Sequence, residues 1–228
     1  MIGIICAMKI EADAIRASLI DAETQTVSGV EFVRGKLHGK DVVLAVCGIG
    51  KVFAAICTEA MILTYAPSLI INSGVAGTLS EELTIGDIAV SSALVQHDMD
   101  TSPIGDPRGL ISGINKIFFE ADPSAANGIE RAAATVGAHC VRGVIASGDQ
   151  FMSDAAKKAW IAKEFGAIAC EMEGAAVAHV AFVNSTPFVV LRAISDSATG
   201  DAQMEYPKFV AMAAARSHAI LDKFIESV

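Results

Sequence analysis

The sequence has few cysteines, and none of them lies in a spacing that is typical of metal binding or redox chemistry. Five cysteines occur among 228 residues, and no two of them form a Cys-x-x-Cys pair. Their number is odd and most of their neighbours are apolar, so we interpret them as reduced core residues of a cytoplasmic protein. The segment "HDMD" at residues 97–100 has no further histidine or cysteine cluster beside it. We therefore interpret it as a polar loop and expect no metal and no cofactor.

Basic residues are also scarce. The chain has 17 Lys and Arg against 26 Asp and Glu, which gives a net charge of −9. No run of basic side chains occurs, although proteins that bind nucleic acids or anionic membranes normally carry one. The sequence therefore predicts no nucleic-acid partner and no membrane partner, and it favours a small-molecule ligand.

Long hydrophobic runs and a targeting segment are missing too. Hydrophobic residues make up 53% of the chain. Gly, Ser, Asp or Arg nevertheless interrupts each apolar run before it reaches the roughly 18 residues of a membrane span. The N-terminal sequence "MIGIICAMKIEADAIR" has neither the basic start nor the cleavage site of a signal peptide. We therefore expect a soluble protein of the cytoplasm.

Short β-branched segments alternate with alanine-rich segments along almost the whole chain. The apolar segments predict strands at residues 2–6, 68–77, 86–96, 141–149, 167–171 and 187–196, and a hairpin at 30–47. Helical periodicity predicts helices at 9–19, 51–66, 124–137, 154–165, 172–184 and 207–227. This alternation predicts an α/β fold: a single-domain, three-layer α/β/α sandwich with a mixed central sheet over residues 1–228. Residues 97–122 lack a clear period, and loops of that length are often lids or contact surfaces.

Several familiar motifs are absent or incomplete. The segment "CGIGKVF" at residues 47–53 is similar to a phosphate-binding loop, but Ala45 replaces the first glycine and Val52 replaces the Ser or Thr that would reach magnesium. A strand-to-helix turn that needs flexible glycines explains this segment better. The sequence has no Gly-x-Ser-x-Gly elbow, no His-Glu-x-x-His and no dinucleotide fingerprint.

Candidate site residues follow the carboxyl ends of the predicted strands, which is the edge where open α/β sheets bind ligands. They are Glu11, Ser73, Val75, Ser147, Asp149, Phe151, Glu171, Glu173, Arg192, Ser195 and Asp196. Singly, each has an ordinary alternative, such as a solvated helix residue for Glu11 or a helix cap for Asp149 and Asp196. Arg192 could equally be the partner of a buried acid. Together, several carboxylates and one arginine suit cleavage of a glycosidic bond, in which an acid protonates the leaving group and a base activates water.

Three stretches together resemble the nucleoside phosphorylase superfamily: "GIICAMKIEAD", "INSGVAGTLSEELTIGDIAVSS" and "SGDQFMSD … ACEMEGAAVAHVAF … PFVVLRAISDSA". Within it they are most similar to the 5′-methylthioadenosine/S-adenosylhomocysteine nucleosidases. The resemblance implies a nucleoside phosphorylase-like sandwich, a homodimer, and an enzyme without a cofactor. It also implies hydrolysis of the N-glycosidic bond of 5′-methylthioadenosine, S-adenosylhomocysteine and 5′-deoxyadenosine, with release of adenine and the 5′-substituted ribose.

The resemblance assigns roles to individual residues. Asp196 matches the general acid that protonates adenine at N7, and Ser195 matches the residue that orients its carboxylate. Glu11 and Arg192 match the pair that positions and activates the attacking water. Glu173 matches the residue that binds the ribose hydroxyls.

Further residues match contacts around the substrate. Met172 matches the side chain against the sugar face, Phe151 the aromatic ring that stacks on the base, and Met152 the backbone that reads the adenine edge. For Glu171 the resemblance gives no catalytic role, and we expect a structural partner at the end of its strand.

Several positions depart from the family pattern. Val75 stands where these nucleosidases often have serine, so that one polar contact near the water or the ribose is expected to be absent, whereas Ile49 suits a pocket for a 5′-alkylthio group. Larger or purely apolar groups are usual at three further positions, here Thr101, Ile104 and Tyr206. The segment 101–104 would come from the partner subunit, so that each 5′ pocket is completed by the dimer.

Three alternatives stay open. 6-Amino-6-deoxyfutalosine shares the adenine and ribose contacts and differs at the 5′ end, so it is an alternative substrate. A phosphate-dependent purine nucleoside phosphorylase would need arginines around a phosphate, but apart from Arg192 none lies in the expected loops. A non-enzymatic nucleoside binder would not need Glu11, Glu173 and Asp196 together. Water is therefore the predicted nucleophile.

Overall fold

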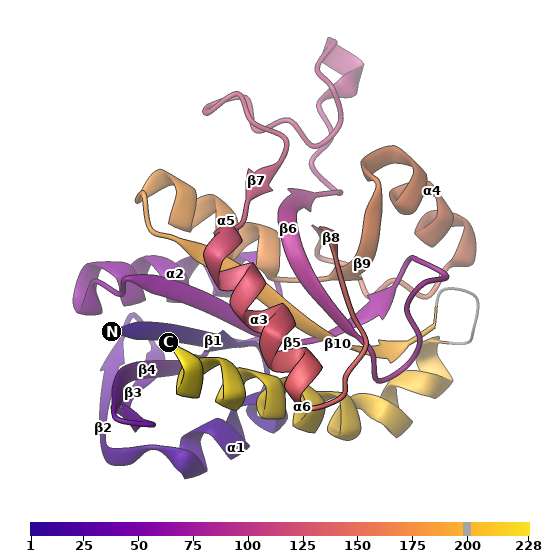
Figure 1. Cartoon of the computed structure of the whole chain (residues 1–228). Coiled ribbons are helices and arrows are strands. Elements are labelled where there is room, and N and C mark those ends of the chain that lie inside the picture. The colour runs from indigo at the N-terminus through magenta and orange to yellow at the C-terminus, as the bar shows by residue number, and fades with distance from the viewer. Residues whose placement is uncertain (198–201) are drawn as a thin grey trace.

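The computed structural model describes residues 1–197 and 202–228 and contains a mixed sheet of ten strands (Figure 1). The strands are β1 (Ile2–Cys6), β2 (Ile20–Val27), β3 (Val30–Leu37), β4 (Lys40–Val46), β5 (Leu69–Thr78), β6 (Ile88–Gln96), β7 (Phe119–Glu120), β8 (Cys140–Ser147), β9 (Ala167–Glu171) and β10 (Phe188–Asp196). Their order is β10-β6-β8-β9-β5-β1-β4-β3-β2, with β7 paired to β6. β1 is parallel to β4 and β5, whereas β3 is antiparallel to β2 and β4. The predicted mixed sheet is confirmed.

Helices cover both faces of this sheet. The helices α1 (Lys9–Ser18), α3 (Pro123–Thr135) and α6 (Ala202–Ser227) pack together on one face. On the other face, α2 (Lys51–Tyr65) packs against α5 (Gly174–Val183), while α4 (Ala155–Phe165) lies against β8 and β9 (Figure 1). The predicted three-layer α/β/α arrangement is therefore confirmed. Among residues 1–197 and 202–228, no helix combines the length and the apolar character that crossing a bilayer would require.

The central strands are apolar because they are covered on both sides. Every residue of β1 and of β10 is buried, including Ile4, Ile5 and Val190. Parallel strands that are covered by helices on both faces have continuous apolar sequences of this kind. Polar side chains cap the starts of two helices: Asp122 accepts the backbone N–H of Ala125 at 2.7 Å at the start of α3, and Asp154 accepts that of Lys157 at 2.8 Å at the start of α4.

Five strands close on one another at one end of the sheet. β10 pairs with both β5 and β6, and β9 pairs with both β5 and β8, while β8 pairs with β6. The register places Gly77 of β5 opposite both Cys170 of β9 and Asp196 of β10. This closure, which the alternating sequence pattern does not specify, brings the carboxyl ends of three strands to one place.

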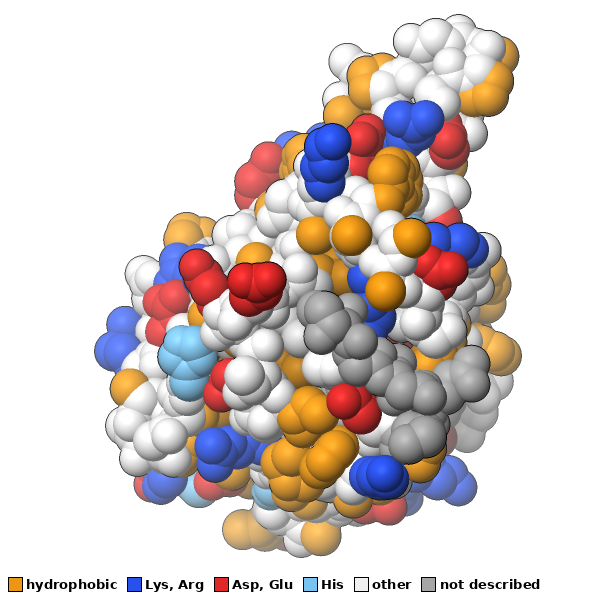
Figure 2. Space-filling model, turned by 90° about the vertical axis from the view of Figure 1, so that its right-hand side faces the viewer, with side chains coloured by type: hydrophobic (Ala, Val, Ile, Leu, Met, Phe, Trp, Pro, Cys, Tyr) orange, Lys and Arg blue, Asp and Glu red, His pale blue; other side chains and the backbone are white. Residues whose placement is uncertain are grey.

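Two elements differ from the sequence-based expectation. The sequence pattern does not predict the strand β2, because "IDAETQTV" is polar and almost wholly exposed. This strand pairs only with β3, at the edge of the sheet. The last helix begins before the expected residue 207 and contains Pro207. The aperiodic segment 97–122 holds a short 3-10 helix (Ser102–Ile104) and β7, and its middle part projects beyond the rest of the molecule (Figures 1 and 2).

Candidate active site

A cavity of about 350 Å³ lies where the ends of β1, β5, β9 and β10 meet. Its lining consists of Ala7, Met8, Glu11, Ile49, Val75, Ala76, Gly77, Gln150, Phe151, Met152, Cys170, Glu171, Met172, Glu173, Ser195, Asp196 and Tyr206. The volume is in the range of pockets that enclose small organic ligands, roughly 300–1,000 Å³. Four carboxylates of the candidate set, Glu11, Glu171, Glu173 and Asp196, therefore line one cavity.

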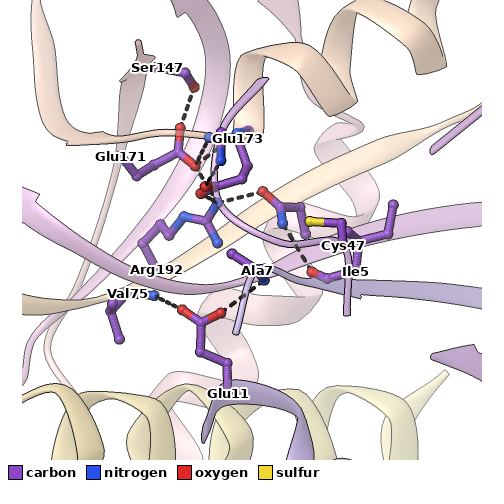
Figure 3. A network of polar contacts seen from close by, with 12 residues as sticks. Ile5, Ala7, Glu11, Cys47, Val75, Ser147, Glu171, Glu173 and Arg192 are labelled. Atoms are coloured by element: carbon purple, nitrogen blue, oxygen red, sulfur yellow. Dashed lines mark hydrogen bonds and ion pairs between the residues drawn. The ribbon is translucent and has the colours of Figure 1, made fainter. Parts of the chain in front are cut away.

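Glu11 is held in the cavity wall by backbone N–H groups. Its Oε2 accepts the N–H groups of Ala7 and Met8 at 2.9 Å each, and its Oε1 accepts the N–H of Val75 at 3.1 Å (Figure 3). Burial raises the pKa of Glu11, although the charge of Arg192 and these three hydrogen bonds oppose the rise. The result is a fixed carboxylate that binds a proton more readily than a solvated one does.

Glu11 and Arg192 approach the same backbone atom from two sides. A Cβ on Gly74 would lie 2.6 Å from Arg192 Nη1 and 2.6 Å from Glu11 Oε1. Only glycine leaves room for both groups at this point of β5, because a methyl group would have to displace one of them. Val75 itself lines the cavity and contributes its main chain to Glu11, so its apolar side chain does not remove that polar contact.

Glu171, which lines the cavity, forms a buried ion pair with Arg192 behind it. The Arg192 Nη2 donates to Glu171 and to Asn72 Oδ1, and Glu171 also accepts the hydroxyl of Ser147 (Figure 3). The backbone N–H groups of Glu173 and Gly174 donate to Glu171 at 3.0 and 2.8 Å. Burial alone would raise the pKa of Glu171, but Arg192 and these donors hold it below its ordinary value. Glu171 is thus the permanently charged partner of Arg192.

Glu173 accepts fewer hydrogen bonds than Glu171 does. Its Oε1 accepts the N–H of Gly50 at 2.8 Å, and its Oε2 lies 3.8 Å from Arg192 Nη2. Burial and the adjacent charge of Glu171 raise the pKa of Glu173 to about 7. At neutral pH this carboxyl group can therefore either accept or donate hydrogen bonds to hydroxyl groups in the cavity.

Asp196 ends β10 on another side of the cavity. Its Oδ1 lies 3.0 Å from Ser195 Oγ, and its Oδ2 accepts a hydrogen bond from Lys158 Nζ at 3.0 Å. A Cβ on Gly77 would lie 2.6 Å from Asp196 Oδ2, so glycine is required here as well. The carboxylate is fixed by its strand, a hydroxyl, a lysine and the backbone of β5.

Aromatic and sulfur-containing side chains form the remaining wall. Phe151 and Tyr206 make an edge-to-face contact with their ring centroids 5.5 Å apart. The hydroxyl of Tyr206 lies 3.2 Å from the sulfur of Met8, and Met152 and Met172 also line the cavity. An apolar wall opposite several carboxylates suits a ligand with a flat ring and a hydroxylated part.

Two predicted residues lie away from this cavity, and a third lies behind its wall. Thr101 and Ile104 belong to the projecting segment, where Ile104 is 82% exposed. They do not line the cavity of their own chain. Arg192 is 1% exposed and contacts the cavity only through the carboxylates around it.

Other candidates from the sequence have structural roles in the described part of the chain. Ser73 Oγ lies 3.0 Å from Ser217 Oγ, in the packing between β5 and α6. Asp149 accepts the backbone N–H of Lys51 at 2.8 Å at the start of α2, which matches its alternative interpretation as a helix cap. In the "HDMD" segment, Asp98 pairs with Lys51 at 2.6 Å.

Sequence reasoning missed several side chains that the structure brings to the site, among them Met8, Lys158, Gln150 and Cys170. Met8 lines the cavity beside Glu11, and Lys158 contacts Asp196 from α4. The position of Met8 directly after β1, three residues before Glu11, could have indicated it. Lys158 follows Lys157 in a helix whose other lysines are exposed, so no local pattern distinguishes the buried one.

Comparison with known proteins gives a consistent family. The model of the "Phosphorylase superfamily" matches residues 1–226. A 5′-methylthioadenosine/S-adenosylhomocysteine nucleosidase of Shewanella loihica is 38% identical over 214 residues, which cover 93% of this chain and 93% of the relative.

Solved structures agree. The chain superposes with a TM-score of 0.95 on the Neisseria meningitidis 5′-methylthioadenosine/S-adenosylhomocysteine nucleosidase in complex with methylthio-immucillin-A, at 34% identity and with 100% and 99% of the two chains covered. A futalosine hydrolase of Helicobacter pylori gives a TM-score of 0.94 at 36% identity and covers 100% and 97%. The chain therefore belongs to the phosphorylase superfamily and, within it, to the 5′-methylthioadenosine/S-adenosylhomocysteine nucleosidases.

Proposed function

We propose that this protein hydrolyses the N-glycosidic bond of 5′-methylthioadenosine and S-adenosylhomocysteine, releasing adenine and the corresponding 5′-thioribose. The observation that carries the proposal is the meeting of Glu11, Glu173 and Asp196 around one cavity of about 350 Å³. Hydrolysis at a sugar needs a proton donor for the leaving base and a base for water, on opposite sides of the bond. 5′-Deoxyadenosine offers the same bond and the same contacts, and is a further expected substrate.

Glu11 is the proposed general base. Its carboxylate is fixed by three backbone donors, and its raised pKa suits a group that must take a proton from water near neutral pH. Arg192 approaches the same glycine as Glu11 and is proposed to fix the carboxylates and the direction of the attacking water. Because it is buried behind the wall, its effect on the reaction is exerted largely through its charge.

Asp196 is the proposed general acid for adenine N7, with Ser195 beside it to orient the carboxylate. Glu173 is proposed to bind the ribose hydroxyls, where positive charge develops as the bond breaks, and Met172 to contact the sugar face. Phe151 would stack on the base, while the backbone of Met152 reads its edge. Electrostatic stabilisation by carboxylates placed around the sugar acts more strongly in the transition state than in the substrate, as catalysis requires.

Water is favoured over phosphate as the nucleophile. Among the residues that the structure describes, no lysine or arginine lines the cavity. A phosphorylase must hold a dianion against the sugar and normally uses arginine for this purpose. Carboxylates around the same space would repel phosphate, so hydrolysis suits this cavity better.

The substrate's 5′ group is the least constrained part. Ile49 and Tyr206 line the cavity and are proposed, with Val75, to contact it. The likeness to the futalosine hydrolase of Helicobacter pylori makes 6-amino-6-deoxyfutalosine a second candidate substrate. Adenine and ribose contacts would be common to all of these nucleosides, so preference among them depends on the 5′ pocket.

A homodimer is proposed to complete that pocket. On α2, the side chains of Val52, Ile56 and Leu63 recur at four- and seven-residue spacing on one helix face and are 69%, 42% and 73% exposed. A helix face of this kind is typical of an interface between subunits. In such a dimer Thr101 and Ile104 of one subunit would extend the 5′ pocket of the other. The location in the cytoplasm remains a prediction.

The substrate assignment is tested by measuring kcat/KM for adenine release from a panel of nucleosides. The panel contains 5′-methylthioadenosine, S-adenosylhomocysteine, 5′-deoxyadenosine and 6-amino-6-deoxyfutalosine, each in phosphate-free buffer. We expect the two thio-nucleosides to give the highest values. A clear preference for the futalosine derivative would move the protein to the second candidate function.

A further inference from the structure

The proposed acid, Asp196, is held in a buried ion pair. Lys158 Nζ donates to Asp196 Oδ2 at 3.0 Å and to the backbone carbonyl of Ser197 at 2.7 Å. Lys158 is 2% exposed and Asp196 is 3% exposed. Since Ser195 Oγ lies 3.0 Å from the other carboxylate oxygen, both oxygens of Asp196 have a partner within the protein.

This arrangement raises a chemical difficulty for the proposed acid. In an ion pair the carboxylate is ionised, and an ionised carboxylate is an acceptor only. It has no proton to give to a leaving base. Two groups donate protons to Asp196, the ammonium group of Lys158 and the hydroxyl of Ser195, each at 3.0 Å, and only the ammonium group carries a positive charge that it can give up with its proton.

Stability is a weak explanation for the pair. Taking a lysine and an aspartate out of water costs several kcal/mol per ion, and apolar replacements of a buried pair are often as stable. Lys158 is also absent from the cavity lining, where Asp196 is present. Lys158 therefore reaches the reaction only through Asp196.

We propose that Lys158 is a positioning residue that fixes the Asp196 carboxylate and holds the proton that Asp196 passes to the leaving base. The inference rests on the proposed hydrolysis and deepens it by naming where the proton resides before the reaction. The ammonium group of Lys158 donates to Asp196 Oδ2 at 3.0 Å, so its proton lies within reach of the carboxylate that faces the base.

The proton transfer balances as follows. An Nζ–H bond of Lys158 breaks as an O–H bond forms at Asp196, and this new O–H bond then breaks as its proton forms the N7–H bond of the base. The electron pair of the glycosidic bond goes to the base, and water adds to the sugar as its second proton passes to Glu11. Afterwards Glu11 releases its proton to solvent, and the Lys158 amine takes one up.

The other titratable groups around Lys158 and Asp196 are either neutral or already paired, so the proton for the base is assigned to this pair. On β9, burial raises the pKa of Cys170 to about 12, so the thiol is neutral, and Glu171 is committed to Arg192. On α6, burial and nearby carboxylates raise the pKa of Tyr206, so the phenol is also neutral. Glu205 accepts hydrogen bonds from the backbone N–H and hydroxyl of Ser197 and is the one further acid nearby on the described part of α6.

The test is the pH profile of kcat for adenine release by wild type, Lys158→Met and Lys158→Gln. Methionine keeps the side-chain length without a proton, and glutamine keeps a donor that cannot be deprotonated. Lys163→Met, an exposed lysine on the same helix, is the matched control. Melting temperatures establish that each variant is folded.

Without Lys158 no ammonium proton lies beside the Asp196 carboxylate, so the proton for the base must reach Asp196 from solvent. We expect kcat of both variants to fall at least about 100-fold at about pH 8 and by much less at about pH 5, while Lys163→Met follows wild type. A constant ratio to wild type at all pH values, or no change, would overturn the proposal. If neither variant folds, Lys158→Arg keeps a cation beside Asp196 that does not give up its proton, and wild-type activity of this variant at all pH values would overturn the proposal as well.

The proposed function is judged separately. Wild-type adenine release without phosphate tests hydrolysis, whatever the variants do. Only the pH dependence of the ratio between variant and wild type tests Lys158.

Discussion

The backbone N–H of Glu173 donates to the carboxylate of Glu171 at 3.0 Å, yet the pKa values of the two side chains are shifted in opposite directions. Glu171 is neutralised by Arg192 and its pKa is lowered, whereas the pKa of Glu173 is raised to about 7. The charge fixed on Glu171 contributes to the rise at Glu173. Because Arg192 pairs with Glu171, Glu171 is a structural anion, whereas Glu173, two residues further on, is a titratable group in the cavity.

This difference predicts a pH dependence of stability. The folded protein binds a proton at Glu173 up to about pH 7, whereas the unfolded chain loses it near its ordinary value of 4.5. Glu173 therefore contributes stability that is complete below pH 4.5 and is lost as the pH rises towards 7. We expect Glu173→Gln to flatten the fall in unfolding free energy over this interval, measured by urea denaturation at several pH values. An unchanged slope would contradict the raised pKa.

Removal of the structural anion should be costly. Glu171→Gln leaves the buried guanidinium of Arg192 without its main partner, and breaking a buried ion pair typically costs about 3 kcal/mol or more. The exposed ion pair of Arg16 and Glu31 provides the control, because Glu31→Gln should change the unfolding free energy by less than about 1 kcal/mol. Equal changes in unfolding free energy for the two substitutions, measured by denaturant titration, would show that the buried pair of Glu171 and Arg192 stabilises the fold no more than an exposed pair does.

Much of the fold could be predicted because local sequence and burial agree. The strands β1 and β10 are largely apolar segments, and the helices between them have clear helical periodicity. Both features predict the elements that the structure contains. The edge strand β2 could not be found, since its polar side chains carry no period and its pairing depends on β3. The closure of β10 onto both β5 and β6 is a matter of tertiary packing, which no local segment encodes.

For the site, sequence position predicted which residues could meet but not what each one contacts. The carboxylates at strand ends do share a cavity. The ion pair of Lys158 with Asp196 joins residues 38 positions apart, and nothing in the lysine-rich segment of α4 indicates which lysine is buried. Family likeness supplied the proposed roles; the geometry adds the partners of each group.

The glycines beside the carboxylates give a steric prediction. In Gly77→Ala the new Cβ would lie 2.6 Å from Asp196 Oδ2, so the carboxylate must move. A displacement of about 1 Å at a reacting group can cost about 100-fold in rate, and we expect kcat to fall by about that factor with little change in fold. Gly113→Ala is the control, because a Cβ there meets nothing within 4 Å. Full activity of the Gly77 variant would show that Asp196 tolerates displacement.

The proposed dimer predicts a specific effect on α2. Val52→Glu places a charge in the exposed apolar face of this helix and should halve the molar mass measured by light scattering. Thr64→Glu, at an exposed polar position on the same helix, should leave the mass unchanged. Wild-type protein that is already monomeric at micromolar concentration would remove the partner subunit from the 5′ pocket.

The central claim is hydrolysis with Asp196 as the acid, and its most direct test is adenine release from 5′-methylthioadenosine in phosphate-free buffer by wild type and Asp196→Asn. The account predicts release by wild type that does not increase when phosphate is added, and a rate lower by about 10²–10⁴ in the folded variant. Release that begins only after phosphate is supplied, or a fully active Asp196→Asn, would contradict it.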